Sequence, residues 1–300
     1  MAEGAGLENR CTRKGIVSSN LTLSVTTVCA LVLAVIPRND ATAQTSDSAR
    51  ANAPLFVRTD PYVLGAFAVA TIAMFPLDKH LASQVRDEDL LANKKLMQAS
   101  HVFRFFGGTG PYIIGGAMYA VGRAARLRRV TQLGVHGTEG VVVGASISGV
   151  LKLLLGRARP YTTADTNPRN FGVGRGIKGS DYQSFPSGHS TSAFAAAAAV
   201  SAEMAEWWPH QRWVFNPILY TGASLVGLSR IYEDKHWASD VVMGAAIGSF
   251  AGLKVVRFNH THEGNRIDRF LMGSMAARPS SLQMYFSGRE TLHVQMHRQF

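Results

Sequence analysis

Hydrophobic residues are grouped in long blocks along the central part of the chain. Six apolar runs occur, and short polar or charged links separate all of them except the third and fourth. The runs cover residues 61–77, 105–122, 139–155, 190–206, 214–229 and 238–257. None of them shows the alternation of apolar and polar residues that is typical of a half-buried strand, and the sequence has no internal repeat. The pattern therefore predicts an all-α fold, a six-helix bundle within residues 60–257.

The N-terminal part of the chain has the layout of an export signal. Within residues 1–43, basic residues precede an apolar core at 21–36, and Ala-Thr-Ala at 41–43 is a small-x-small cleavage site. Both cysteines lie inside this segment, so cleavage would leave a cysteine-free chain suited to an oxidising compartment. An uncleaved membrane anchor is the alternative. Residues 44–59, rich in Ala, Ser, Thr and Asn, are predicted to form a linker.

The chain ends in a predicted tail, residues 258–300. Apolar and polar residues alternate on both sides of a Ser-Gly-Arg-Glu turn at 281–296, which predicts a hairpin. His260 and His262 lack Cys or carboxylate partners at ligand spacing, so we expect a solvated tail here and no metal site. Structural or surface roles are also expected for the isolated histidines His80, His101, His136 and His210.

The stretch that ends at Asp240 carries the first candidate for catalysis. Arg230 precedes His236 by six residues, and Asp240 follows it by four. In a helix that begins near His236, this spacing puts the carboxylate beside the imidazole, where it accepts the Nδ1 proton and leaves Nε2 as a nucleophile. The guanidinium of Arg230 is placed to bind an oxyanion. By itself, a His and an Asp at this spacing are also typical of a surface pair.

Two further stretches supply the groups that a phosphate site needs. Lys152 and Arg159 are seven residues apart, so they share a helix face, and a proline directly after Arg159 ends that helix. Ser187, Gly188 and His189 stand at the start of an Ala-rich run. The free N–H groups at such a helix start bind anions. Together the three stretches indicate a phosphate site.

An up-and-down bundle brings these stretches together. The end of the third helix, the start of the fourth, the end of the fifth and the start of the sixth all lie at one end. Residues 161–185, a polar and Gly-rich connection, open over that end. They form either a substrate-access loop, with Arg169, Arg175 and Lys178 as headgroup contacts, or an insertion without a function.

These residues resemble the signature of the type 2 phosphatidic acid phosphatase / vanadium haloperoxidase superfamily. That pattern is K-x6-R-P, then P-S-G-H, then S-R-x5-H-x3-D. The matching positions in this sequence are Lys152, Arg159, Pro160, Pro186, Ser187, Gly188, His189, Ser229, Arg230, His236 and Asp240. No position departs from the pattern, and the resemblance covers roughly residues 60–257. It implies the six-helix core of that superfamily.

The resemblance implies a phosphatase that needs no metal or other cofactor and works in two steps. His236, oriented by Asp240, would attack phosphorus and form a phosphohistidine. His189 would protonate the leaving oxygen and then activate the hydrolytic water. The transferred phosphate, or vanadate as its analogue, would be held by Lys152, Arg159, Ser187, Gly188 and Arg230.

The expected substrate is a phosphomonoester or diphosphate of a lipid, such as phosphatidic acid or a prenyl diphosphate. Three alternatives stay open: a vanadium-dependent haloperoxidase, a general periplasmic acid phosphatase acting on small soluble phosphomonoesters, and a binding protein without turnover. Haloperoxidases are usually longer chains. A binding protein needs the cations but not the two histidines and the aspartate.

Charge and hydropathy bear on the location of the protein. The net charge of +11 comes without a basic run interleaved with aromatic residues, which argues against nucleic acid and suits an anionic membrane surface or substrate. Charge-free helix cores of about 12 to 18 residues fall short of the ~20 that span a bilayer. Four arginines at 123–129, opposite the site, place the site outside by the positive-inside rule. A cleaved signal would instead start the first helix outside the membrane and place the site on the inner side. A membrane-embedded bundle and a soluble or peripheral one are therefore both open, and we expect a periplasmic active site in either case.

Overall fold

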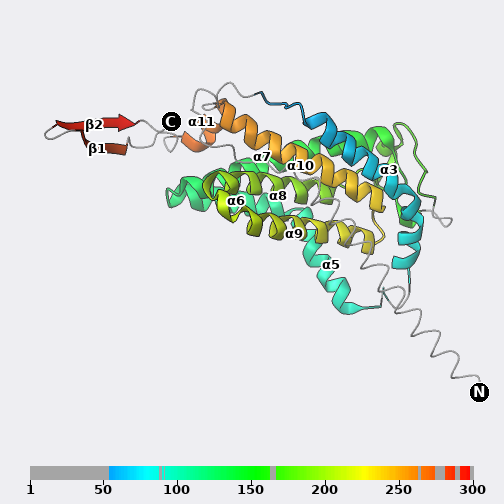
Figure 1. The fold of residues 1–300 in the computed structure, drawn as a ribbon. Helices are drawn as coiled ribbons and strands as arrows, with labels where there is room; N and C mark the ends of the chain where they lie inside the picture. Colours follow the sequence, from blue (N-terminus) through cyan, green and yellow to red (C-terminus); the bar gives the residue numbers. More distant parts are fainter. Residues whose placement is uncertain are drawn as a thin grey trace, which may run out of the picture.

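The computed structural model describes residues 54–87, 90, 92–162, 167–262, 265–273, 281–287 and 291–297. The predicted export signal and residues 44–53 of the predicted linker lie outside this part of the chain. The helices are α3 (Asp60–Val85), α5 (Lys94–Gly107), α6 (Gly110–Ala124), α7 (Arg128–Leu155), α8 (Gly188–Trp207), α9 (Arg212–Tyr232), α10 (Ala238–Thr261) and α11 (Arg266–Met272). Figure 1 shows the long helices side by side in one bundle. The predicted all-α fold is confirmed.

The second apolar run, residues 105–122, forms parts of two helices instead of one. α5 starts after Asn93, whose side-chain oxygen accepts from the N–H groups of residues 95 and 96. The chain leaves the helix at Gly108, and α6 begins two residues later. At Gly107 a Cβ would lie 2.8 Å from the carbonyl oxygen of His189, so only glycine allows this close approach. α5 was missed because its residues are mixed polar and apolar.

The core is built around α8, which packs against α7, α9 and α10. Alanines fill five of its eleven buried positions, and three of the others are serines. On α10, Gly244, Gly248 and Gly252 recur every fourth residue and face the backbone of α8. A Cβ at Gly248 would lie 2.2 Å from the carbonyl oxygen of Thr191. These small residues let the two helices that carry much of the site lie very close together.

The C-terminal region is more helical than predicted, because α10 runs to Thr261 and α11 follows within the predicted tail. The predicted hairpin at 281–296 is present as β1 (Ser281–Ser287) and β2 (Thr291–His297), an antiparallel pair in which Leu282 faces Met296. However, α10 continues past residue 257. His260 therefore lies in a helix and contacts a carboxylate from α8, rather than lying in a solvated tail.

Three stretches are long and apolar enough to cross a membrane by length and composition: Asp60–Val85, Arg128–Thr162 and Ala238–Thr261. The short charge-free cores in the sequence concealed this, because the helices extend beyond them at both ends. Along α7, Val143, Ile147, Val150 and Leu154 recur at helical spacing, and each is more than 40% exposed. Such an apolar outer face suits contact with lipid.

Candidate active site

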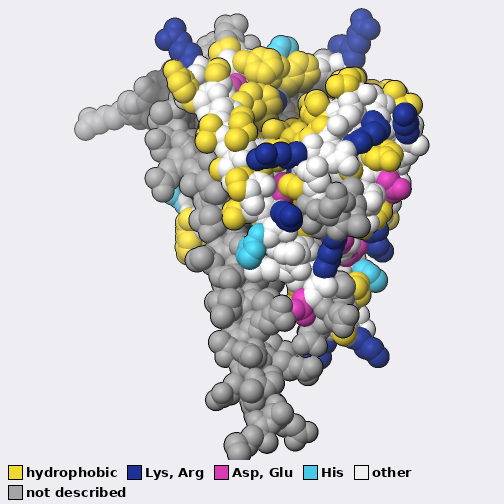
Figure 2. Space-filling view, turned by 90° about the vertical axis from the view of Figure 1, so that its right-hand side faces the viewer, with side chains coloured by type: hydrophobic (Ala, Val, Ile, Leu, Met, Phe, Trp, Pro, Cys, Tyr) yellow, Lys and Arg dark blue, Asp and Glu magenta, His cyan; other side chains and the backbone are white. Residues whose placement is uncertain are grey.

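The three motif stretches meet at one end of the bundle, as the up-and-down arrangement predicts. They border a cavity of about 650 Å³. Figure 2 looks onto this end of the molecule, where Lys and Arg side chains lie among hydrophobic ones. The described residues that line the cavity are His101, Arg104, Phe105, Gly108, Thr109, Lys152, Arg159, Gln183, Gly188, His189, Arg230, Glu233, Lys235 and His236.

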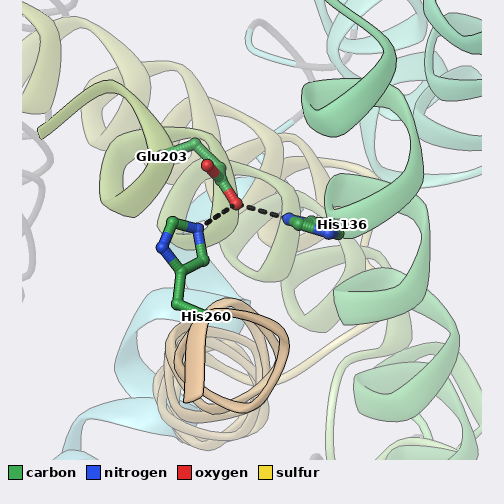
Figure 3. A group of neighbouring side chains, drawn as sticks. All are labelled: His136, Glu203 and His260. Atoms are coloured by element: carbon green, nitrogen blue, oxygen red, sulfur yellow. Dashed lines mark hydrogen bonds and ion pairs between the residues drawn. The ribbon is translucent and has the colours of Figure 1, made fainter. Parts of the chain in front are cut away.

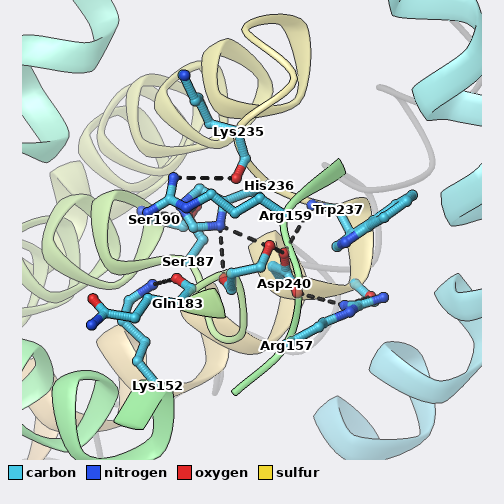
Figure 4. A network of polar contacts seen from close by, with 12 residues as sticks. Lys152, Arg157, Arg159, Gln183, Ser187, Ser190, Lys235, His236, Trp237 and Asp240 are labelled. Carbon is cyan, nitrogen blue, oxygen red and sulfur yellow. Dashed lines mark hydrogen bonds and ion pairs between the residues drawn. The ribbon is translucent and has the colours of Figure 1, made fainter. Parts of the chain in front are cut away.

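His236 is held in a single orientation from one side of its ring. Its Nδ1 lies 2.7 Å from the carbonyl oxygen of Ser184 and 3.5 Å from Oδ2 of Asp240 (Figure 4). A carbonyl oxygen only accepts, so Nδ1 carries the proton and Nε2 has the lone pair. Burial lowers the pKa of His236 to about 3, helped by the cations Lys152 and Arg159 and opposed by Asp240. The ring is thus a neutral nucleophile at ordinary pH.

Asp240 acts as a buried anchor for this histidine. The carboxylate is fully buried and accepts from the hydroxyl of Ser184 and the backbone N–H of Trp237. The expected pairing with His236 is present, but the closer partner of Nδ1 is the Ser184 carbonyl. Ser184 therefore contacts both members of the pair, and the sequence motif gave no sign of it.

Arg157 is a second supporting group that the motif spacing did not indicate. It is fully buried, and its Nη1 donates to Asp240 Oδ1 while its Nη2 donates to Asp78 Oδ2. Nε and Nη2 also donate to the carbonyl of Pro168, in the long connection after α7. The guanidinium thus joins α3, this connection and α10 behind the site, where Figure 4 shows it directed at Asp240.

The lining residues give the cavity a strongly positive charge. Among the described ones, Glu233 is the single acid, against five cations: Arg104, Lys152, Arg159, Arg230 and Lys235. Arg230 Nη2 donates to Glu233 at 2.6 Å. Its Nε and Nη1 are buried and have no hydrogen-bond partner among the described residues. Buried donors left without an acceptor are costly, which points to an anionic ligand.

His189 stands opposite these cations at the start of α8. Burial lowers its pKa to about 3, and the nearby charges of Arg230, Lys152 and Arg159 act in the same direction. Without a ligand the ring is therefore neutral at ordinary pH. A bound phosphate would supply the negative charge that favours its protonation.

Ser187 takes a different place from Gly188. Its hydroxyl accepts from the N–H and the hydroxyl of Ser190, which makes it the N-cap of α8. The residue is fully buried and is absent from the described lining of the cavity, whereas Gly188 forms part of that lining. Phosphate binding by the Ser187 hydroxyl stays a prediction.

The 161–185 connection supports the site from behind. Arg175 donates to the carbonyls of Gly156 and Asn170, which fastens this connection to the end of α7. Neither Arg175 nor the other two expected headgroup contacts, Arg169 and Lys178, is among the described lining residues. The headgroup role of all three stays a prediction.

α5 adds His101 and Arg104 to the cavity, although His101 was expected to have a structural or surface role. The sequence carried little sign of this contribution, because α5 lies outside the motif stretches and was not predicted. Arg104 lies 3.8 Å from the carboxylate of Glu233, so it extends the positive lining on the side of α9.

Comparison with known proteins relates this fold and sequence to one superfamily. Residues 137–263 match the model of the PAP2 superfamily. The crystal structure of a transmembrane PAP2 type phosphatidylglycerolphosphate phosphatase from Bacillus subtilis superposes with a TM-score of 0.50. At 20% identity, the match covers 69% of this chain and 100% of that one, and it shows the shared fold.

Curated relatives match parts of the chain. The lipid A 1-phosphatase of Porphyromonas gingivalis is 43% identical over 74 residues, which are 25% of this chain and 16% of that protein. The undecaprenyl-diphosphatase of Sulfolobus acidocaldarius is 29% identical over 45% of this chain and 63% of its own length. The lipid A 1-phosphatase of Rhizobium johnstonii is 32% identical over 51% of this chain and 57% of its own length. The chain thus spans less than two thirds of each of these relatives.

Proposed function

We propose that this protein is a phosphatase that removes phosphate from a membrane lipid through a phosphohistidine on His236. One observation carries the proposal. A neutral histidine, held through Nδ1, borders a cavity with five cationic side chains, where Arg230 keeps two buried donors without a partner. Fixed donors of this kind stabilise the charge of a transferring phosphoryl group. The reacting phosphate then needs no metal ion.

The residues take the following roles in this reaction. Nε2 of His236 attacks phosphorus while Lys152, Arg159 and Arg230 hold the non-bridging oxygens. His189 donates a proton to the leaving oxygen, and the alcohol or phosphate departs. A water that gives its proton to His189 then attacks phosphorus, and the bond to Nε2 breaks. Asp240 and Ser184 keep the Nδ1 proton in place throughout.

A lipid substrate is favoured by the surface next to the cavity. Phe105 lines the cavity and is itself 42% exposed. Exposed apolar side chains continue from it along α5 and α6, among them Val102, Phe106, Ile113 and Ile114. An acyl or prenyl chain can lie along this surface while its phosphate occupies the cavity. The names of the relatives, lipid A 1-phosphatase and undecaprenyl-diphosphatase, agree with this substrate class.

We place the site on the outer side of the membrane, facing the periplasm. Arg123, Arg126, Arg128 and Arg129 lie in or near the α6–α7 link, at the end of the bundle opposite the cavity. Arg129 stacks on Trp207 and Trp208, aromatic residues of the type that occupy a membrane interface. An excess of arginine marks the cytoplasmic end of membrane helices. Cleavage of the predicted export signal belongs to the same proposal.

The function is tested by measuring phosphate release with chelator present. We expect the protein in detergent to hydrolyse lipid A 1-phosphate, a prenyl diphosphate or phosphatidic acid at least tenfold faster than p-nitrophenyl phosphate, since only the lipids use the apolar surface. Vanadate is expected to inhibit all of these reactions.

Equal rates on all substrates would indicate a general acid phosphatase instead. Loss of activity with chelator, at a temperature at which the chelator-treated protein stays folded, would contradict a metal-free active site. Vanadate-dependent bromide oxidation without phosphate release would indicate a haloperoxidase.

The acid role of His189 predicts a dependence on the leaving group. His189→Asn is expected to lose about 10²–10⁴-fold in kcat on a lipid phosphate, whose alkoxide must be protonated as it departs. The loss with p-nitrophenyl phosphate should be at least tenfold smaller, because p-nitrophenolate leaves without a proton. Rates of the variant and the wild type are compared on both substrates. Equal losses would remove His189 from the acid role.

A further inference from the structure

Two histidines and a glutamate meet at the end of the bundle opposite the cavity. His136 of α7, Glu203 of α8 and His260 of α10 offer ligand atoms that all lie within 4.8 Å of one another (Figure 3). His136 lies about 24 Å along α7 from Lys152, at ~1.5 Å rise per residue. The cluster therefore has no part in the proposed phosphoryl transfer and needs a separate account.

Glu203 is the centre of the cluster and is fully buried. Its Oε1 contacts Nδ1 of His136 and, at 2.9 Å, Nε2 of His260. Its Oε2 is buried and has no hydrogen-bond partner among the described residues. A buried carboxylate oxygen without a partner is costly, so a positively charged ligand at Glu203 would be stabilising.

We propose that His136, Glu203 and His260 bind a divalent transition metal ion of the Zn²⁺ type. Two imidazole nitrogens and one carboxylate form a donor set that zinc uses, with water completing a tetrahedron. The three ligands come from three helices, so the ion ties α7, α8 and α10 together at this end. The side chain of His260 is 27% exposed, which gives the ion a way in from the surface.

The surroundings of the cluster are those of a metal site. Nε2 of His136 lies 3.3 Å from Oδ1 of Asp268 in α11. A metal-binding histidine commonly donates its other N–H to a carboxylate in this way, which fixes the ring and leaves the first nitrogen free to bind. Glu139, one turn after His136, accepts from the side chain of Asn259 and is a further acidic group nearby.

A network of hydrogen bonds without a metal ion explains the contacts of the cluster less completely than a bound ion does. In such a network both rings must present an N–H to the same oxygen of Glu203, and His136 must present a second N–H to Asp268. His136 would then be a buried cation, and Glu203 Oε2 would still have no partner. A metal ion uses the nitrogen lone pairs and brings the carboxylate into a complete coordination sphere.

The proposal is tested by titrating the metal-free full-length protein in detergent with Co²⁺ and following the visible absorption of tetrahedral cobalt. We expect saturation at one ion per chain and displacement by Zn²⁺. Glu203→Gln and, as a second variant at the partly exposed position, His260→Asn should lose this absorption. His262→Asn is the matched control, because this exposed histidine lies just beyond α10 and outside the cluster, and it should bind as the wild type does.

The affinity for Zn²⁺ and the melting temperature of the protein give two further measurements. Asp268→Asn should weaken Zn²⁺ binding about 10–100-fold, the usual cost of losing an outer-shell carboxylate. Chelator should lower the melting temperature of the wild type, and Zn²⁺ should restore it. No cobalt absorption and no effect of chelator on melting would overturn the proposal and leave an ion-pair network only. Phosphate release reports on the other end of the bundle, so failure of one proposal is distinguishable from failure of the other.

Discussion

His236→Asn is expected to abolish phosphate release, with kcat reduced by on the order of 10⁴-fold or more. The asparagine amide can still donate to the Ser184 carbonyl in place of Nδ1, so the local structure is retained. It has no counterpart of Nε2, so no phosphohistidine can form. Vanadate binding should persist, because the cations that line the cavity are unchanged. Turnover and vanadate binding are measured on the same preparation.

A histidine outside the site provides the control for this experiment. His80 on α3 is exposed, and among the described residues its side chain hydrogen-bonds only to Gln84. His80→Asn should therefore keep full activity in the same membrane or detergent preparation. Isotope labelling gives a direct check: substrate with labelled phosphorus should leave acid-labile label on the wild type during turnover and none on His236→Asn. Substantial turnover by His236→Asn would eliminate the histidine as nucleophile.

The sequence predicted the helical fold well because its apolar runs are long and its motifs are placed at helix ends. The position of Arg159, His189, Arg230 and His236 at one end followed from helix order alone. The prediction of a single helix over residues 105–122 was wrong. The α5–α6 break lies in a glycine-rich stretch before Pro111, a local turn signal that the count of apolar residues passed over. The close approach of Gly107 to His189 is a long-range contact that no local pattern reports.

The site could be predicted only as far as the motif positions reach. The groups that support it come from elsewhere: Ser184 from the connection before α8, and Asp78 from α3. Arg157 lies two residues before Arg159 in the sequence, but the spacing alone does not predict which residues it contacts. The cluster at the other end was missed for the same reason, because His136, Glu203 and His260 are brought together only by the packing of three helices.

Arg157 is expected to be as important as the motif residues, although it is a positioning residue behind the site. Arg157→Met removes the cation between Asp78 and Asp240 and leaves both buried carboxylates without their countercharge. Breaking a buried pair in this way costs about 3–5 kcal/mol of folding free energy. The variant should melt at a clearly lower temperature or fail to accumulate. Arg257→Met is the control, because that arginine donates to a backbone carbonyl and pairs with no carboxylate among the described residues.

Arg157→Lys separates the positioning role from the structural one. Lysine keeps the charge, so the protein should fold, but it cannot donate to Asp240, Asp78 and the Pro168 carbonyl at once. Asp240 then shifts, the His236 ring follows, and kcat should fall about 10²-fold, the effect of a small misplacement of a reacting group. KM and vanadate inhibition should change little, because the phosphate is held by other cations. A folded Arg157→Lys protein with wild-type kcat would show that Arg157 serves stability alone.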